Sequence, residues 1–236
     1  MTRTIPAQAK GDTPMPKLRF DLYEGLRFWS ALTHGVGALL GAAGGITLLV
    51  LAALRGADAL SITGIAIFTA SMVALYLASC LYHCVNTTPK KRLFLRNLDH
   101  SMIYVLIAGT YTPVCLSVLR GPLGWTMFGI IWGLAVLGVI CTLCWLNAPR
   151  TLTTCFYIGM GWIALLAVRP LLAALPATAS AWMLLGAAAY TVGGVLYAVK
   201  WPLKDHAKFG CHEIFHVFVL LGSVCFFQMM CAIFLG

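Results

Sequence analysis

The sequence contains few charged residues, and acidic residues are the scarcest. Charged side chains make up 10% of the 236 residues, and only seven are Asp or Glu. Hydrophobic residues account for 61% and the mean hydropathy is +0.90. This composition excludes an ordinary soluble domain and predicts membrane-spanning helices. The polar, basic stretch 1–27 lacks the apolar segment of a secretory signal peptide, so we expect it to form a basic cytoplasmic tail.

Seven apolar runs are long enough to cross a bilayer, since a spanning helix needs about 20 residues. Polar or Gly/Pro-rich turns separate them. The runs cover approximately residues 28–54, 60–83, 98–119, 124–146, 154–175, 181–200 and 211–236, and Arg169-Pro170 interrupts the fifth. We therefore expect an all-α, polytopic membrane protein with seven transmembrane helices in one domain, residues 28–236. Pro113 predicts a kink in the third helix.

The basic residues predict the orientation in the membrane. Thirteen of the 16 Lys and Arg residues precede the first run or lie in or near the connections after the second, fourth and sixth. Because Lys and Arg favour the cytoplasmic side, the N-terminus is expected inside and the C-terminus outside, in the inner (plasma) membrane. The net charge of +9 then reflects topology and attraction to anionic inner-leaflet lipids, with no need for a nucleic-acid partner.

Ionisable residues inside the predicted spans are few, and such residues are usually functional. Counted from the nearest Lys or Arg, they lie roughly 5–12 Å from the cytoplasmic boundary, at 1.5 Å per residue. Four different helices contribute them: His34, His83, Asp99 with His100, and His212 with His216.

The spacing of these residues predicts a metal site. His212 and His216 stand four residues apart, so they share one helix face. Together with His83 they offer three nitrogen ligands and leave a fourth position open, the arrangement of a catalytic rather than a structural zinc. Asp99 and Ser79, which precedes His83 by one turn, are expected beside the metal as partners of its ligands or of a water. His34 and His100 are expected mainly to pack.

The nine cysteines do not predict a disulfide framework, because they lie mainly within the apolar runs. Cys141 and Cys144 form an isolated C-x-x-C, which we expect to be packing. Cys80 and Cys211 flank the predicted site, so ligation by a thiolate is a minor alternative.

Three motifs carry a family resemblance. The segment "SCLYHCV" with Ser79 and His83, "LDHSMIYVLIAGTYTP" (98–113) and "HEIFHVFVLLGS" (212–223) resemble, in this order, the hemolysin III family, the bacterial branch of the progestin and adipoQ receptor group. The resemblance covers nearly the whole chain after the tail. It implies a seven-helix bundle with a zinc ion near the cytoplasmic leaflet, bound by His83, His212 and His216. It also places Asp99 and Ser79 beside the metal.

Two details qualify the resemblance. Alkaline ceramidases have a similar His/Asp/Ser constellation, which suggests lipid amide chemistry. The first helix departs from the family pattern, since Ser30 stands where an Asn is expected and Arg27 lies where the family has an acid.

The segment His212-Glu213-Ile214-Phe215-His216 also matches H-E-x-x-H, the pattern of zinc metalloproteases. On a helix, Glu213 points about 100° away from His212, so we expect it to miss a metal held by the two histidines. Intramembrane metalloproteases carry the motif early and a ligand Asp later, whereas here it lies in the last helix and Asp99 precedes it. We therefore expect a zinc pair without protease activity.

Two functions remain open from the sequence. The first is a zinc-dependent hydrolase of a lipid amide or ester, with Asp99 as proton acceptor and Ser79 holding the water or the oxyanion. The second is a non-enzymatic membrane regulator or sensor in which zinc only joins helices. The resemblance implies a role in membrane lipid or fluidity balance. A pore-forming haemolysin is not favoured, because no polar stripe follows the helices.

Overall fold

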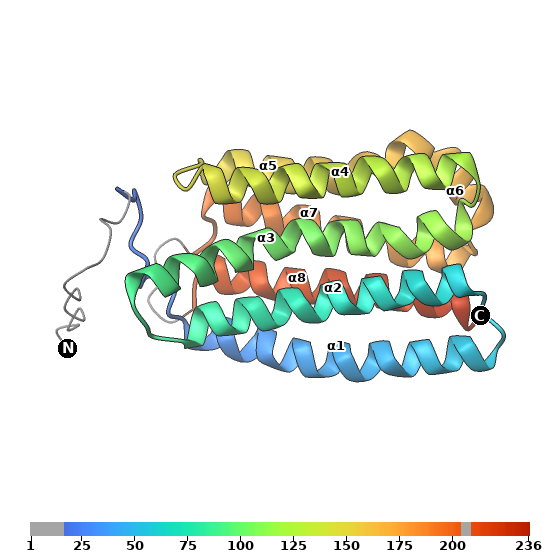
Figure 1. Ribbon diagram of the computed structural model, residues 1–236, viewed down its shortest axis with the longest axis horizontal. Helices are drawn as coiled ribbons and strands as arrows, with labels where there is room; N and C mark the ends of the chain where they lie inside the picture. Colours follow the sequence, from blue (N-terminus) through green and yellow to red (C-terminus); the bar gives the residue numbers. More distant parts are fainter. Residues whose placement is uncertain (1–16, 204–208) are drawn as a thin grey trace.

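The computed structural model describes residues 17–203 and 209–236. Regular structure in these residues is helical, and seven helices are long and apolar enough to cross a membrane, which confirms the predicted fold class. Figure 1 shows them side by side, with residues 17–27 and the C-terminus at opposite ends of the bundle. The elements are α1 (Phe28–Leu54), α2 (Ala59–Cys84), α3 (Pro89–Pro113), α4 (Pro122–Cys144), α5 (Arg150–Gly161), α6 (Val168–Ala174), α7 (Ala177–Val199) and α8 (Cys211–Phe234).

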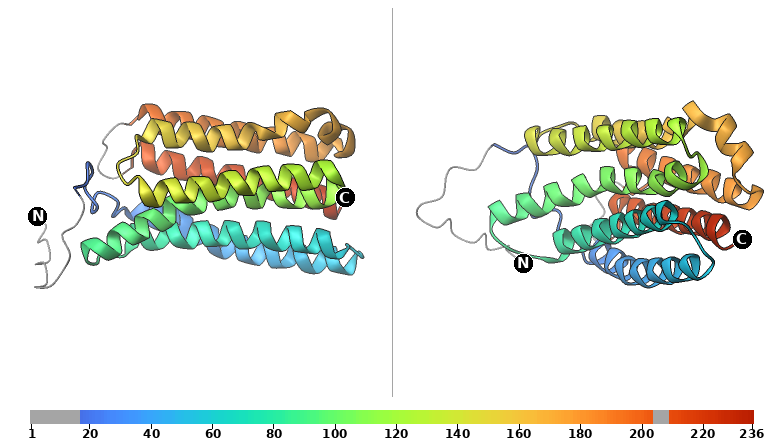
Figure 2. Two further views of the ribbon diagram at one scale, coloured as in Figure 1. Left: turned by 45° about the horizontal axis from the view of Figure 1, so that its top comes forward. Right: turned by 45° about the vertical axis from the view of Figure 1, so that its right-hand side comes forward.

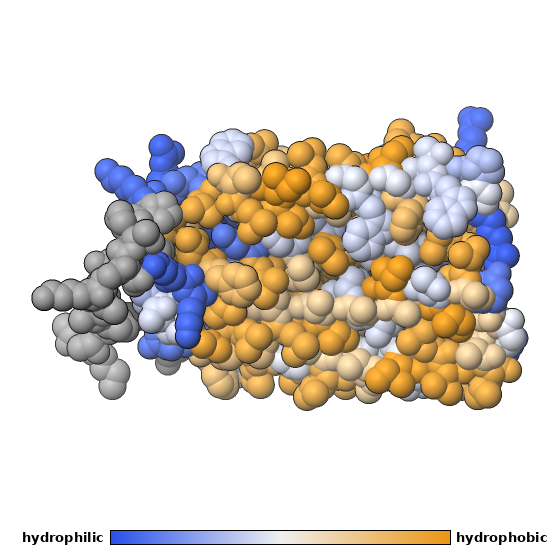
Figure 3. All heavy atoms as spheres, viewed as in Figure 1, coloured by the Kyte–Doolittle hydropathy of each residue, from blue (hydrophilic) through white to orange (hydrophobic). Residues whose placement is uncertain are grey.

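The helices surround an interior space rather than stacking in layers. Helix α8 packs against α7 and α1, α2 packs against α1 and α3, and α5 packs against α7 and α3. Helix α4 lies against α3, on the outside of this ring (Figure 2). On the face that Figure 3 shows, the surface side chains are mostly apolar along the length of the bundle. Lipid is the environment in which such a surface is stable.

Two helices differ from the sequence prediction. Helix α3 begins at Pro89, nine residues before the predicted apolar run. The polar stretch before that run is helical too, and proline is well tolerated at a first helical position. The fifth span is interrupted, as predicted, but the interruption lies just before Arg169-Pro170. The α-helix gives way to a 3₁₀ segment at Trp162–Ala167, and Pro170 lies in the first turn of α6, where its missing N–H is harmless.

Pro113 ends α3, and a π-helical turn, Val114–Val118, follows it. The missing N–H of proline shifts the hydrogen-bond ladder here.

The α2 helix is held closely on both sides by glycines. A Cβ at Gly45 of α1 would lie 2.1 Å from Thr69 Cγ2, and one at Gly109 of α3 would lie 2.1 Å from Ser71 Oγ. These close approaches fix α2, and hence the histidine in its last turn.

Residues 17–27 form a strap across one end of the bundle. Residues 1–16 of the predicted tail lie outside the described residues. The strap is made of turns and is tied to the ends of the helices. The Tyr23 hydroxyl donates to the Thr87 carbonyl at 3.0 Å, and the buried Arg92 guanidinium donates to the Leu22 carbonyl at 2.9 Å. The side chain of Asn147 bonds the backbone of both Lys17 and Arg19. We call this the strap end of the bundle.

Candidate metal centre

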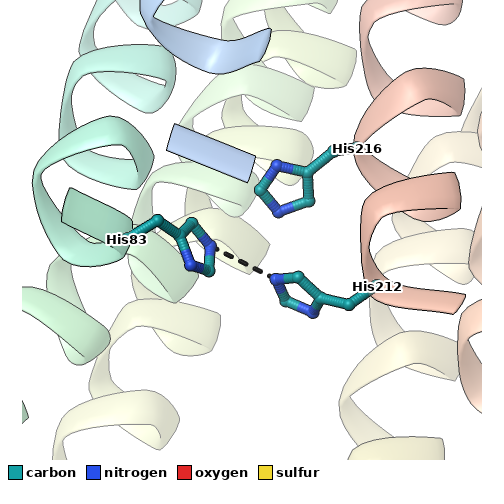
Figure 4. A group of neighbouring side chains, drawn as sticks. All are labelled: His83, His212 and His216. Atoms are coloured by element: carbon teal, nitrogen blue, oxygen red, sulfur yellow. Dashed lines mark hydrogen bonds between the residues drawn. The ribbon is translucent and has the colours of Figure 1, made fainter. Parts of the chain in front are cut away.

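Three histidines meet inside the bundle near the strap end. His83 comes from the last turn of α2, and His212 and His216 come from the first two turns of α8 (Figure 4). One ring nitrogen from each lies within 4.8 Å of the others. His83 Nε2 and His212 Nε2 are 3.2 Å apart. His83 and His216 are buried, with 2% and 3% of their surfaces exposed.

The three histidines could hold a metal ion, and one of their separations suits tetrahedral zinc. With Zn–N distances of about 2.0–2.1 Å, two ligand nitrogens lie about 3.3 Å apart, close to the His83–His212 separation. His83 Nδ1 is 2.6 Å from the Gly25 carbonyl, which can only accept, so Nδ1 carries the proton and Nε2 presents its lone pair to the site. His216 Nδ1 is buried and has no hydrogen-bond partner among the described residues.

His34 of α1 lies next to this group without belonging to it. Its ring stacks on that of His216, with 3.9 Å between the centroids and 18° between the planes. It is 3% exposed, and neither ring nitrogen has a partner in the described part of the chain. His34 therefore supports the position of the His216 ring by stacking.

The predicted partners Asp99 and Ser79 are close by but outside the three-histidine group. Both are buried, Asp99 with 7% of its surface exposed and Ser79 with 1%. Asp99 Oδ2 lies 3.6 Å from His100 Nδ1, which also contacts the Arg96 carbonyl at 2.8 Å. Ser79 Oγ makes no hydrogen bond with any described residue. Asp99 and Ser79 both line the cavity described below, so a water or a ligand there can reach them.

The Glu213 carboxylate is bound to other groups. Its oxygens accept from Arg27 Nη1 at 3.0 and 3.3 Å, from the Gly210 backbone N–H at 2.8 Å and from Ser30 Oγ at 3.4 Å. Glu213 thus caps the start of α8 and joins it to α1. Arg27 and Ser30, where the sequence departs from the family pattern, are its partners here. A carboxylate bound in this way is not placed as the general base of a metalloprotease.

A cavity of about 790 Å³ extends from the histidines into the bundle, a size typical of ligand-binding pockets. His212 and His216 line one part of it, together with Asp99 and Ser79. Its deeper part is apolar and is lined by residues of several helices, among them Leu75, Leu106, Leu171, Phe226 and Met229. The strap residues Phe20 and Glu24 line its end near the histidines, which we call the mouth of the cavity. The site therefore joins a cluster of imidazoles to an apolar chamber.

Three residues of the site were not predicted from the sequence. Gly25, Arg27 and Ser30 act through His83 and Glu213, from which they are distant in the chain. The departures from the family pattern at Arg27 and Ser30 were the only sign in the sequence that these residues belong to the site.

The alternative thiol ligands, Cys80 and Cys211, are both free cysteines, and neither belongs to the three-histidine group.

Comparison with known proteins places the chain among similar sequences. A family model described as haemolysin-III related matches residues 26–227. A hemolysin-3 homolog from Bacillus subtilis (strain 168) is 40% identical over 198 residues, which cover 84% of this chain and 89% of that protein. A hemolysin-3 from Bacillus cereus is 39% identical over 198 residues, with 84% and 87% covered. No solved structure matches the chain.

Proposed function

The chain belongs to the haemolysin-III related family, as its motifs had suggested, and on that premise we propose that it is a zinc-binding, multi-pass membrane protein that hydrolyses an amide or ester bond of a membrane lipid. The observation that carries the proposal is the union of three convergent imidazoles with an apolar cavity. A site that only held helices together would not need such a chamber.

The residues around the site have distinct roles in this proposal. Zinc, when bound by His83, His212 and His216, supplies Lewis acidity, which polarises a carbonyl group and makes water more acidic. The Gly25 carbonyl keeps His83 in the ligating tautomer. Asp99 accepts the proton of the attacking water. Ser79, whose hydroxyl has no partner among the described residues, donates to the oxygen on which negative charge develops.

The location of the site agrees with a lipid substrate. The histidines lie one to two helical turns inside the strap end, and lipid ester and amide bonds lie just beneath the headgroups of a bilayer. In our proposal the strap end faces the cytoplasm, the substrate comes from the inner leaflet of the plasma membrane, and hydrolysis adjusts lipid composition or fluidity. The strap excludes bulk water from the mouth of the cavity.

The burial of His83 and His216 favours a second candidate, in which the metal only joins α2 to α8 and the protein is a non-enzymatic regulator. Neither candidate requires a pore or a protease site.

The metal is tested first. The purified protein should contain about one zinc per chain, and His83→Ala, His212→Ala and His216→Ala should each lose most of it, as measured by elemental analysis. Cys211→Ala is the matched control on the same turn of α8, and it should keep the metal. A folded, zinc-free wild-type protein would contradict the site.

Asp99→Asn separates the two candidates. The amide keeps the shape and one acceptor oxygen but loses the basicity. A hydrolase should retain zinc and lose release of fatty acid from a lipid panel by about 100-fold or more, the usual contribution of a positioned acid–base group. A regulator with a structural metal would show no hydrolysis in the wild type and only a change in stability in the variant.

A further inference from the structure

The mouth of the cavity carries two arginines that form no salt bridge within 4.0 Å among residues 17–203 and 209–236, although the buried Asp99 carboxylate acts on Arg96 electrostatically. Arg96 of α3 and Arg150, the first residue of α5, both line the cavity and are half-buried. The Arg–carboxylate pairs of the described chain involve other arginines, Arg27 and Arg120. A partly desolvated cation without a carboxylate at salt-bridge distance is incompletely compensated, and this applies above all to Arg150, so this position suits an anionic ligand.

Aromatic rings hold both guanidinium groups in place. Arg96 Cζ lies 3.9 Å from the centre of the Phe20 ring, and Arg150 Cζ lies 4.7 Å from that of Tyr197. Phe20 and Tyr197 line the same cavity as the two arginines. Stacking uses the flat face of a guanidinium and leaves the N–H donors on its edge free to bond. Arg150 Nη2 already donates to the Ala198 carbonyl at 3.5 Å, so its other donors would serve a ligand.

A third group points to a ligand independently. Thr154 follows Arg150 by four residues and therefore lies on the same face of α5. It lines the cavity, it is 2% exposed, and its Oγ1 has no hydrogen-bond partner in the described part of the chain. The first turn of α5 adds the partial positive charge of a helix N-terminus. A hydroxyl donor, two guanidinium groups and a helix N-terminus together form an anion site.

We propose that Arg96, Arg150 and Thr154 bind the phosphate of an anionic membrane lipid whose acyl chain occupies the apolar part of the cavity. Guanidinium groups match phosphate oxygens in a bidentate fashion, and a lipid supplies both the anion and the apolar tail that the cavity accommodates. The proposal rests on the proposed function in one respect, because it names the class of lipid that the three-histidine site would act on. It specifies an anionic headgroup rather than a zwitterionic one.

The test is lipid binding to the full-length protein in nanodiscs of phosphatidylcholine, after removal of metal with a chelator. Fluorescent phosphatidylglycerol should bind at least about 10-fold more tightly than a phosphatidylcholine analogue with the same chains. Arg96→Gln and Arg150→Gln should each remove most of this preference, since a charge-assisted hydrogen bond contributes roughly the free energy of a 10-fold change. Thr154→Val, which keeps the shape and all charges, should reduce it a few-fold.

Lys91→Gln is the matched control. Lys91 is an exposed cation at the same end of the bundle, outside the cavity lining, and its substitution should leave the preference intact. An equal loss in Lys91→Gln would reduce the effect to general surface charge and overturn the proposal. Inorganic phosphate should compete weakly; if it displaced the lipid as effectively as phosphatidylglycerol does, the site would bind free phosphate and not a lipid.

The outcomes separate this proposal from the hydrolase. Equal binding of the two lipids by a protein that retains zinc and hydrolyses lipid would refute the anion site alone. A clear preference for the anionic lipid in a protein that never binds zinc would refute the metal site alone.

Discussion

Glu213→Gln tests whether the H-E-x-x-H glutamate is structural or catalytic. The Glu213 side chain is 2% exposed and that of Arg27 is 22% exposed. The groups that hydrogen-bond the carboxylate are all donors: the Arg27 guanidinium, the Ser30 hydroxyl and the Gly210 N–H. Glutamine keeps one acceptor oxygen but turns an NH₂ group toward one of these donors. The substitution therefore leaves a buried donor unsatisfied as well as removing the charge.

The expected cost follows from these contacts. Hydrogen bonds to a charged group contribute about 1.5–3 kcal/mol, and the partial exposure of Arg27 reduces the value of its pairing. We expect the free energy of unfolding to fall by about 2–3 kcal/mol. For a chain of this length that lowers the melting temperature by roughly 5–10 °C. Zinc content should stay near one per chain, because Glu213 is not in the three-histidine group.

The measurement is thermal unfolding in detergent together with zinc analysis. Glu24→Gln is the control, since Glu24 also faces Arg27, at 4.0 Å, but is 67% exposed; its effect should stay below about 0.5 kcal/mol. Adding Arg27→Gln to Glu213→Gln should cost less than the sum of the single changes, because the two residues are coupled. An unchanged melting temperature would refute the role of the ion pair. Loss of lipid hydrolysis at full stability and zinc content would instead restore Glu213 as a general base.

Two further predictions concern the strap and the topology. In Gly25→Ala the new Cβ would lie 2.2 Å from the Tyr82 hydroxyl. Because the Tyr82 ring is buried, we expect the strap to shift, and the Gly25 carbonyl with it. Zinc affinity, measured by competition with a chelator, should then fall about 10- to 100-fold, whereas Gly129→Ala, which meets nothing within 4 Å, should leave it unchanged. A reporter fused after Gly236 should be active only outside the cytoplasm, and cytoplasmic activity would also overturn the assignment of the cavity to the inner leaflet.

Hydropathy was sufficient to predict the number of membrane spans, because burying about 20 apolar residues in lipid is a local property of each segment. It was less reliable at the helix ends. The third apolar run begins at residue 98, whereas α3 begins at Pro89. A helix continues into polar sequence wherever its own backbone hydrogen bonds are satisfied. The interruption of the fifth span was predicted a few residues too late, because the sequence does not show that Pro170 falls in a first turn, where proline is tolerated.

The sequence by itself therefore determined the class of protein, its family and the two ligand candidates that share one turn of α8, His212 and His216. Helical spacing is a property of the chain alone. The sequence also predicted His83 as the third ligand, from its depth in the membrane. Only the tertiary structure decided that Gly25 orients His83 and that Glu213 turns to Arg27, 186 residues away. It also decided that Arg96 and Arg150 share one cavity mouth. These juxtapositions depend on how α1, α2, α3, α5 and α8 pack around one another, and packing is set by the contacts of all the helices together rather than by any one segment.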